Sequence, residues 1–539
     1  MRSLLRVCIA CLLASSLPAA AAESAVSLAA LRSHLDFLAS DALEGRDTGT
    51  RGYEIAALYA AAQFRQSGLA PGNGESYFQQ VPLTESKLDS SSLEIVSGGM
   101  PTALVWKEDY VLSARAGHPQ VEIETPVVFA GFGIDAPESG RADYAGVDVT
   151  GKIVLVLTGA PADFPSEQRA HYASSRQKRI EAARRGAVGL VTLRTRDDER
   201  RSPWERSVLN ADRPSMTWRH PDGTPVDDSP GLRVTAGLSH AGAGKLLVGA
   251  TATLEELLDL GEAGGRGSRE LGVTLRAAVR STLRELESPN VVALLTGAEP
   301  ARRDEIVVFT AHLDHVGVGA EVDGDAIYNG YYDNAMGSAV VLEVARALAR
   351  SPRPARSVAF VLVTGEERGL LGSDFFAQHP SFAGARVVAD LNVDMPLFLH
   401  PVADLVAFGA EHTTLGELAR AAAEANGFVL TPDPEPEESI FVRSDQYSFV
   451  RQGIPAIYLC PGHGSRVAGE NGGAAVESFR REHYHRPSDE GALPTDWDGV
   501  VRFAAVHVEL TRAAANADEP PRWLAGSFFS ELFGGADAP

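Results

Sequence analysis

Three apolar, strand-like runs of the sequence each end in side chains that can bind a metal ion. The runs and the side chains that follow them are 306–311 with His312, 357–364 with Glu366 and Glu367, and 387–393 with Asp394. Asp333 lies between the first two runs, directly before a helix-like stretch at 334–350. Open α/β sheets build their sites at the carboxyl ends of their strands. The sequence therefore predicts such a site here.

The types of these side chains indicate zinc. Imidazole nitrogen and carboxylate oxygen are zinc ligands, and catalytic zinc keeps one position open for water. Five candidates are too many for one tetrahedral ion, but they suit two Zn²⁺ per chain that share one carboxylate. The five are His312, Asp333, Glu367, Asp394 and a late histidine in the segment 483–490. Manganese or cobalt also fits such ligands. Two neighbouring ions can hold a hydroxide between them and polarise a scissile carbonyl group.

Two acids remain outside this ligand set. Asp314 follows His312 by two residues on an extended segment, so both point to the same side, and it could orient the imidazole. Glu366 precedes Glu367 and could accept a proton from the attacking water. Considered alone, the Glu366–Glu367 pair would suit a helix N-terminus. We expect structural roles for His315 and His483, because the ligand set is complete without them.

These motifs resemble those of the co-catalytic zinc exopeptidases, which include bacterial leucyl aminopeptidase and glutamate carboxypeptidase. The matching segments are His312-Leu313-Asp314, Asp333-Asn334-Ala335, TGEERGLLGS at 364–373, Asn392-Val393-Asp394-Met395, Arg443-Ser444-Asp445, and Tyr484-His485 with Asp489. Met336 stands where the family usually has Ser, and Tyr331 and Tyr332 replace smaller residues. We expect these bulky groups to narrow the pocket.

The resemblance implies a role for each site residue. Asp333 would bridge two zinc ions. His312 and Asp394 would complete one zinc site, and Glu367 and His485 would complete the other. Glu366 would be the general base and Asp314 the orienting acid. The hydroxyl group of Tyr484 would stabilise the developing oxyanion.

The expected fold is α/β, with a mixed, largely parallel central sheet flanked by helices and a smaller β-rich inserted domain. The inserted block resembles a protease-associated domain, and it contains no cluster of metal ligands. We predict a long surface loop at 194–230, because this segment is rich in Arg, Asp and Pro. The expected organisation is a signal peptide at 1–22, the N-terminal part of the peptidase domain at 23–115, the insert at 116–285, the catalytic domain at 286–515 and a C-terminal tail at 516–539.

The first 22 residues are typical of a secretory signal. They combine a basic start, an apolar stretch and a small-residue cleavage site at 20–22. The apolar stretch is shorter than the ~20 residues that a membrane span needs, and a lipid anchor at Cys11 is less consistent with the sequence. A periplasmic or secreted protein is expected. Only Cys460 would then remain of three cysteines, so no intramolecular disulfide could form.

The formal net charge of −22 argues against nucleic acid as a partner, because nucleic-acid binding needs a basic patch. The sequence predicts no membrane span and leaves the oligomeric state open. Peptides are the expected substrates. The leading hypothesis is a secreted dizinc aminopeptidase that uses a metal-bridging hydroxide and Glu366 as its base.

Three alternatives remain. A carboxypeptidase or dipeptidase of the same fold would need a basic group for a free carboxylate, and Arg443 is a candidate. A non-catalytic relative resembling the transferrin receptor is disfavoured by the complete ligand set. A single-zinc acyltransferase resembling glutaminyl cyclase is disfavoured by the bridging Asp333.

Overall fold

The computed structural model describes residues 26–97 and 100–534. The predicted signal peptide at 1–22 lies outside these residues. None of the helices in the described ranges is long and apolar enough to cross a membrane.

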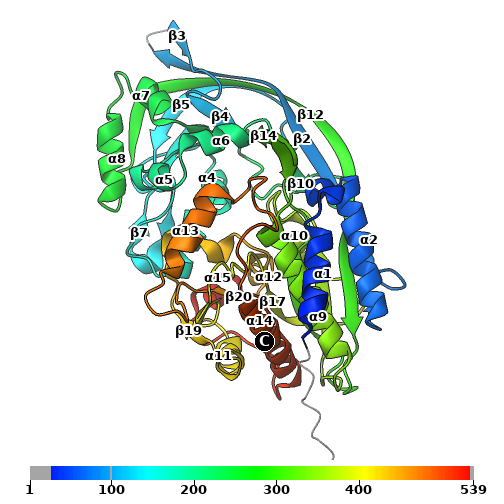
Figure 1. Cartoon of the computed structure of the whole chain (residues 1–539). Coiled ribbons are helices and arrows are strands. Elements are labelled where there is room, and N and C mark those ends of the chain that lie inside the picture. Colours follow the sequence, from blue (N-terminus) through cyan, green and yellow to red (C-terminus); the bar gives the residue numbers. More distant parts are fainter. Residues whose placement is uncertain (1–25, 98–99, 535–539) are drawn as a thin grey trace, which may run out of the picture.

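A mixed sheet forms the centre of the half that carries the motifs (Figure 1). The strands in spatial order are β12 (Arg269–Leu295), β16 (Ser357–Val363), β13 (Glu305–His312), β17 (Arg386–Asn392), β20 (Ala456–Pro461), β18 (Asp404–Phe408) and β19 (Val429–Thr431). The strands from β16 to β20 are parallel to one another, and so is the edge pair β18 and β19. The pairings of β12 with β16 and of β18 with β20 are antiparallel. The strands β16 and β13 are apolar along nearly their whole length, because helices cover both faces of the sheet.

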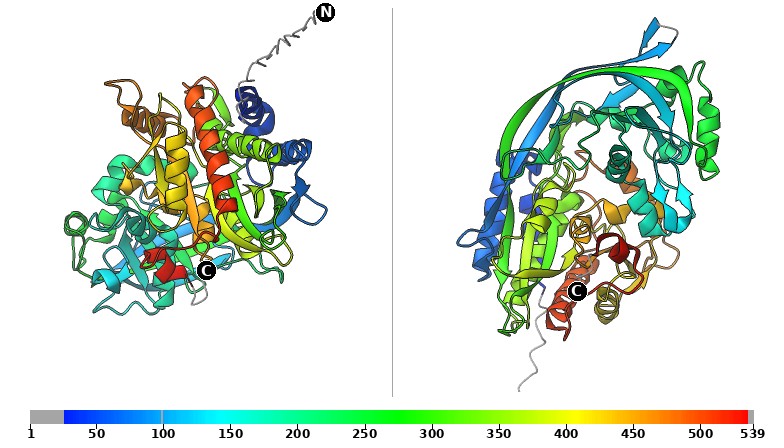
Figure 2. Two further views of the ribbon diagram at one scale, coloured as in Figure 1. Left: turned by 90° about the horizontal axis from the view of Figure 1, so that it is seen from below. Right: turned by 180° about the vertical axis from the view of Figure 1, so that it is seen from behind.

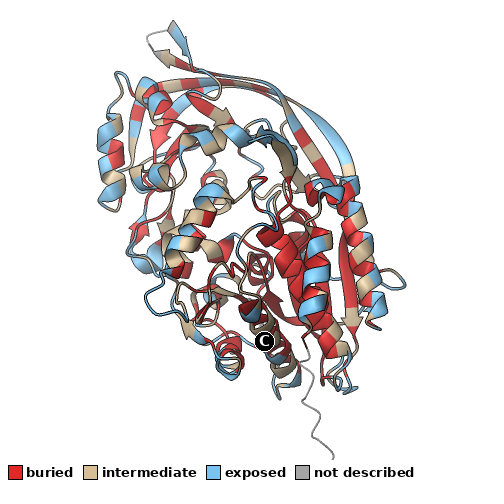
Figure 3. Cartoon of the chain, in the orientation of Figure 1, coloured by how far each residue is buried: buried red, intermediate tan, exposed pale blue. Residues whose placement is uncertain are grey.

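The helices that pack with one face of this sheet into the largest core cluster include α1 (Leu28–Leu38), α2 (Arg51–Gln66), α9 (Met336–Ala349), α11 (Leu415–Ala425) and α14 (Trp497–Asn516). The opposite face packs against α10 (Leu371–Gln378), α12 (Gln446–Val450) and the C-terminal segment. Figure 3 shows the buried residues concentrated in the sheet and on the inner sides of these helices. The predicted α/β architecture is confirmed.

Two long strands connect this half to the insert. The antiparallel partners β2 (Phe78–Ser97) and β12 run from the motif-bearing sheet into the second half, as Figure 2 shows. There the sheet continues through strands that are parallel to one another: β5 (Gln120–Phe129), β8 (Ile153–Leu157), β9 (Gly189–Leu193) and β11 (Val234–Leu238). The insert has a hydrophobic core of its own, yet one continuous sheet joins it to the other half.

The prediction of a long surface loop at 194–230 is wrong. This segment contains two short helices, α5 (Arg196–Arg201) and α6 (Trp204–Asn210), and the strand β10 (Ser215–Trp218), which pairs with β2. The hydroxyl group of Thr195 caps α5, and acidic residues follow in its first turn, where the helix dipole favours them. The charged composition that suggested a loop thus belongs to short capped helices.

The C-terminal segment docks onto the body of the protein. The indole of Trp523 donates to the carbonyl of Gly453 at 2.7 Å. Phe529 in α15 (Phe528–Phe533) is fully buried. His412 beside this segment contacts Glu167 of the insert helix α3 (Ser166–Ala173) at 2.6 Å. The segment therefore packs where the two halves meet.

Candidate metal centre

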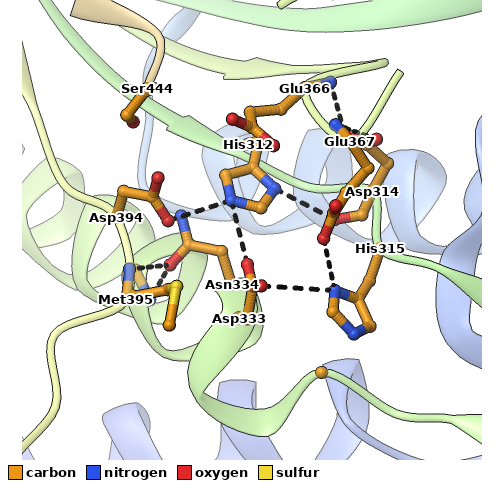
Figure 4. A network of polar contacts seen from close by, with 12 residues as sticks. His312, Asp314, His315, Asp333, Asn334, Glu366, Glu367, Asp394, Met395 and Ser444 are labelled. Carbon is orange, nitrogen blue, oxygen red and sulfur yellow. Dashed lines mark hydrogen bonds and ion pairs between the residues drawn. The ribbon is translucent and has the colours of Figure 1, made fainter. Parts of the chain in front are cut away.

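The sheet brings the predicted metal ligands together near the carboxyl ends of its parallel strands (Figure 4). His312 is the last residue of β13, and Asp394 follows β17 by two residues. Glu366 and Glu367 follow β16 after a turn at Gly365, which has a φ of 69°. Asp333 lies in the turn 331–335 that leads into α9. The parallel alignment of β13 with β16 and β17 therefore explains the proximity of these side chains.

One half of the site consists of His312, Asp394 and one oxygen of Asp333. The His312 Nε2 atom lies 3.0 Å from Asp394 Oδ1 and 3.3 Å from Asp333 Oδ1. All three residues are buried. The carboxylate of Asp394 raises the pKa of His312 well above its usual value, although burial opposes this. We call this cluster the first half-site.

The other half contains His485, Glu367 and the second oxygen of Asp333. The His485 Nε2 atom lies 3.2 Å from Asp333 Oδ2 and 3.1 Å from Glu367 Oε2. His485 comes from the segment after α13 (Gly472–Glu482), and its backbone has a φ of 54°. We call this cluster the second half-site. Asp333 thus presents its two carboxylate oxygens to two different half-sites.

These residues fit a pair of metal ions. Their donor atoms are imidazole nitrogens and carboxylate oxygens, the ligands of catalytic zinc. The Oε1 atom of Glu367 is buried without a hydrogen bond among the described residues. Although burial opposes it, the imidazoles of His312 and His485 hold the pKa of Asp333 well below its usual range. The bridging carboxylate is therefore held in the ionised form that a metal ion requires.

His315 also belongs to the cluster. Its Nδ1 atom lies 2.8 Å from Glu367 Oε1 and 3.9 Å from Asp333 Oδ2. The sequence analysis assigned His315 a structural role and did not predict this contact. The signal that could have indicated this contact is its position three residues after His312, just beyond the end of a strand.

Glu366 lines the same cleft as the ligands Asp333 and Asp394. Burial raises the pKa of Glu366 well above its usual value, and the carboxylate of Asp394 contributes to this shift. A general base must lie within reach of the attacking water, and the position of Glu366 beside the ligands in the cleft suits that role.

Asp314 supports the site through backbone groups. Its carboxylate accepts hydrogen bonds from the backbone N–H of Glu366 at 3.2 Å and of Glu367 at 3.3 Å. The imidazole of His312 meets the Asp314 carbonyl oxygen at 3.1 Å instead of its carboxylate. Asp314 was expected to orient the His312 imidazole, but only its backbone carbonyl meets that ring, and its carboxylate holds the Glu366–Glu367 turn.

Tyr484 lies directly beside the second half-site. Its ring stacks on His485 with 3.9 Å between centroids, and its hydroxyl oxygen accepts from Arg443 Nη2 at 3.2 Å. Burial raises the pKa of Tyr484 above its usual value. The hydroxyl group therefore keeps its proton and can donate it in a hydrogen bond.

Two further residues, to which the sequence analysis gave no role, hold the loops of the site. Arg46 is fully buried and donates to the carbonyls of Leu313 at 3.0 Å and Gly330 at 3.1 Å. The carboxylate of Asp489 accepts from the backbone N–H of Asp333 at 3.1 Å. These hydrogen bonds fix the backbone directly after His312 and the turn that carries Asp333.

Comparisons with known proteins show where this chain is similar to a known family. Residues 290–511 match the model of peptidase family M28. The matched region contains all five predicted metal ligands and Glu366. This similarity indicates a zinc metallo-exopeptidase.

The individual relatives have low sequence identity to this chain. A protein of Mycobacterium tuberculosis named "Probable lipoprotein aminopeptidase LpqL" is 26% identical over 87% of this chain and 82% of its own length. A "Probable zinc metalloprotease" of Pyricularia oryzae is 28% identical over 48% of this chain, and the match spans only 56% of that relative. The solved aminopeptidase from Aneurinibacillus sp. strain AM-1 covers 92% of this chain and 95% of its own, with a TM-score of 0.52 and 18% identity, and so shares the fold.

The candidate metal centre opens into a cleft of about 1430 Å³ between the two halves of the molecule. Its apolar lining near Asp394 comes from Met395, Leu397, Val442, Tyr458 and Val476. Tyr331 and Tyr332 do not line this cleft, so the expectation that they narrow it is wrong. They are buried, and the Tyr332 hydroxyl group donates to the Pro494 carbonyl at 2.6 Å.

The insert closes one side of this cleft. Arg201 of α5 donates to the Glu437 carbonyl at 2.9 Å, and Arg206 of α6 donates to the Arg480 carbonyl at 2.6 Å. Ser166 of α3 donates to Asp433 at 2.7 Å. Arg201 and Arg206 lie in the segment expected to be a loop, so their contribution to the cleft was missed.

Proposed function

We propose that this protein is a dizinc aminopeptidase that removes N-terminal residues from peptides. The observation that supports this most is the bridging position of Asp333, with Oδ1 at 3.3 Å from His312 and Oδ2 at 3.2 Å from His485. A site for a single metal ion does not require one carboxylate that is shared between two separate imidazole ligands.

The ligands fall into two sets that share Asp333. His312 and Asp394 would hold one zinc ion, and Glu367 and His485 would hold the other. When bound, the two ions lower the pKa of a water molecule and polarise the peptide carbonyl group.

The remaining chemistry belongs to the side chains. Glu366 accepts the proton of the attacking water and delivers it to the leaving amine. Asp314 keeps Glu366 in place through the backbone of the turn at 366–367. The Tyr484 hydroxyl group donates a hydrogen bond to the oxyanion, and Arg443 orients that hydroxyl group through its 3.2 Å contact.

The apolar lining next to Asp394 favours a hydrophobic N-terminal residue. The names of the mycobacterial relative and of the solved Aneurinibacillus protein are those of aminopeptidases, which supports the same direction of cleavage. Export through the signal predicted at 1–22 is part of this proposal.

A carboxypeptidase or dipeptidase is the second candidate, because Arg443 lines the cleft and could hold a free carboxylate. The test compares leucyl-alanine amide with N-acetyl-leucyl-alanine. An aminopeptidase cleaves the first and not the second. Cleavage of the N-acetylated peptide at an equal rate contradicts the aminopeptidase assignment.

The general base is tested separately with Glu366→Gln. We expect about a 10²–10⁴-fold lower kcat with unchanged zinc content. Full activity of this variant would remove Glu366 from the mechanism.

A further inference from the structure

His315 occupies a fixed position behind the second half-site. It is fully buried, and its backbone N–H donates to the Arg46 carbonyl at 3.3 Å. Its ring packs on Gly330, where an added Cβ would lie 2.5 Å from two ring carbons. Gly330 has a φ of 58°. The backbone on both sides therefore leaves this imidazole little freedom to turn.

The ring presents one nitrogen to the metal ligands. Nδ1 lies 2.8 Å from Glu367 Oε1, and Figure 4 shows Nδ1 facing the cluster while the other nitrogen points away from it. Neither Nδ1 nor Oε1 has a hydrogen-bond partner among the described residues, so their 2.8 Å contact is a close polar pair without hydrogen-bond alignment. A buried carboxylate oxygen without a partner is costly, and His315 Nδ1 lies within reach of it.

The two oxygens of the Glu367 carboxylate have different partners. Oε1 faces His315, and Oε2 lies 3.1 Å from His485 Nε2. A carboxylate held at one oxygen can present the other in a fixed direction. The rings of His315 and His485 meet edge-on with 5.6 Å between centroids, so the same packing also limits the movement of His485.

We propose that His315 is a positioning residue of the second half-site. Its Nδ1 atom contacts Glu367 Oε1, and this contact keeps Oε2 directed toward the place where the second zinc ion would bind. The inference rests on the proposed dizinc function. It assigns His315 a role behind the ligand Glu367, while His485 remains the imidazole ligand.

The test measures zinc binding to the full-length metal-free protein by isothermal titration, together with zinc per chain after dialysis. His315→Ala is expected to weaken the second zinc by about 10–100-fold, the usual cost of removing a partner of a metal ligand, and to leave the first unchanged. His315→Asn is expected to bind both ions nearly as well as the wild type, because the Asn amide nitrogen lies close to the place of Nδ1.

His483→Ala is the matched control, since His483 neighbours His485 but bonds to Ser488 at 2.9 Å. It should bind both ions as the wild type does. The melting temperature of each metal-free variant shows whether it folds, and an unchanged value with a weakened second zinc supports the positioning role.

Three results would overturn the inference. A wild-type second-zinc affinity in His315→Ala shows that the contact does not matter. An equally large loss in His315→Asn shows that His315 is itself a ligand. A wild type that binds a single zinc ion overturns the dizinc function, and the inference with it, whereas the first two results leave the dizinc function standing.

Discussion

The two half-sites share Asp333 but are built differently. In the first, His312 and Asp394 follow adjacent parallel strands, and their side chains are 1% and 11% exposed. In the second, Glu367 follows a strand, but His485 comes from a segment more than a hundred residues downstream and is 29% exposed. The first half-site is therefore built on the sheet, and the second half-site is completed by a residue from a loop.

This difference has an energetic consequence. Strand ends inside a packed sheet are already ordered, so little conformational entropy is lost when they bind a metal ion. A loop residue must be ordered at that moment, at a cost of roughly 1–2 kcal/mol for its backbone. We expect the first half-site to bind zinc more tightly than the second.

The largest effect is expected from Asp333→Asn, which weakens both half-sites together. The neutral amide lacks the charge that balances two cations and offers only one good acceptor. Zinc content should fall from about two ions per chain toward none, and activity should be lost. Elemental analysis after gel filtration measures this, and retention of one full zinc ion would show that Asp333 serves only one half-site.

A matched pair, His312→Ala and His485→Ala, separates the two half-sites. The variant of His485 should keep one tightly bound zinc ion, because the first half-site remains intact. The variant of His312 should lose its tight site and keep only weaker binding. Calorimetric titration distinguishes the two variants. Equal affinities of both variants for the remaining zinc ion would contradict the proposed difference between the half-sites.

The same asymmetry explains what the sequence could predict. The ligands that follow strands, His312, Glu367 and Asp394, were identified from apolar runs that end in polar side chains. His485 was found by motif, because no local pattern reports a contact with Asp333 across 152 positions of sequence.

Other contacts could not be predicted from local patterns. Arg46 lies in a polar turn near the N-terminus, yet its guanidinium is buried beneath Leu313 and Gly330. Arg201 and Arg206 reach the cleft from helices too short to give a clear periodicity. The role of the Asp314 carboxylate depends on the direction in which the chain turns after β16, and only the three-dimensional structure gives that direction.

Acidification should empty the second half-site progressively. In the metal-free protein, Glu367 and Asp333 raise the pKa of His485 to about 9, although burial opposes this. A protonated imidazole cannot bind zinc, so below that pKa the ion must displace a proton. The apparent affinity should fall about tenfold per pH unit below about pH 9.

Titration with zinc between pH 6 and pH 9 measures this dependence. The buffer without protein serves as the control for zinc hydroxide formation. An affinity of the second half-site that does not change over this range would contradict the assignment of His485 as a ligand.

The smallest effect is expected from Asp314→Asn. The amide oxygen can still accept one hydrogen bond from the turn at Glu366 and Glu367, but the negative charge and the second acceptor are lost. We expect about a tenfold loss of activity, the lower end of the range for partners of metal ligands. Thr48→Val removes only a 3.1 Å hydrogen bond to the same carboxylate and should cost less.

Comparison of kcat for these two variants completes the series. A loss for Asp314→Asn as large as that for Glu366→Gln would mean that Asp314 takes part in the proton transfer itself. Equal losses in Asp314→Asn and Thr48→Val would mean that the turn is held mainly by other contacts.

Anomalous diffraction at the zinc edge from crystals of the zinc-loaded protein tests the central claim most directly. The account predicts two peaks that share Asp333, the first bound by His312 and Asp394 and the second by Glu367 and His485. The first peak should keep its full occupancy in crystals soaked with a weak chelator, and the second should fade. A single peak, or a second peak bound by His315 without His485, would contradict the account.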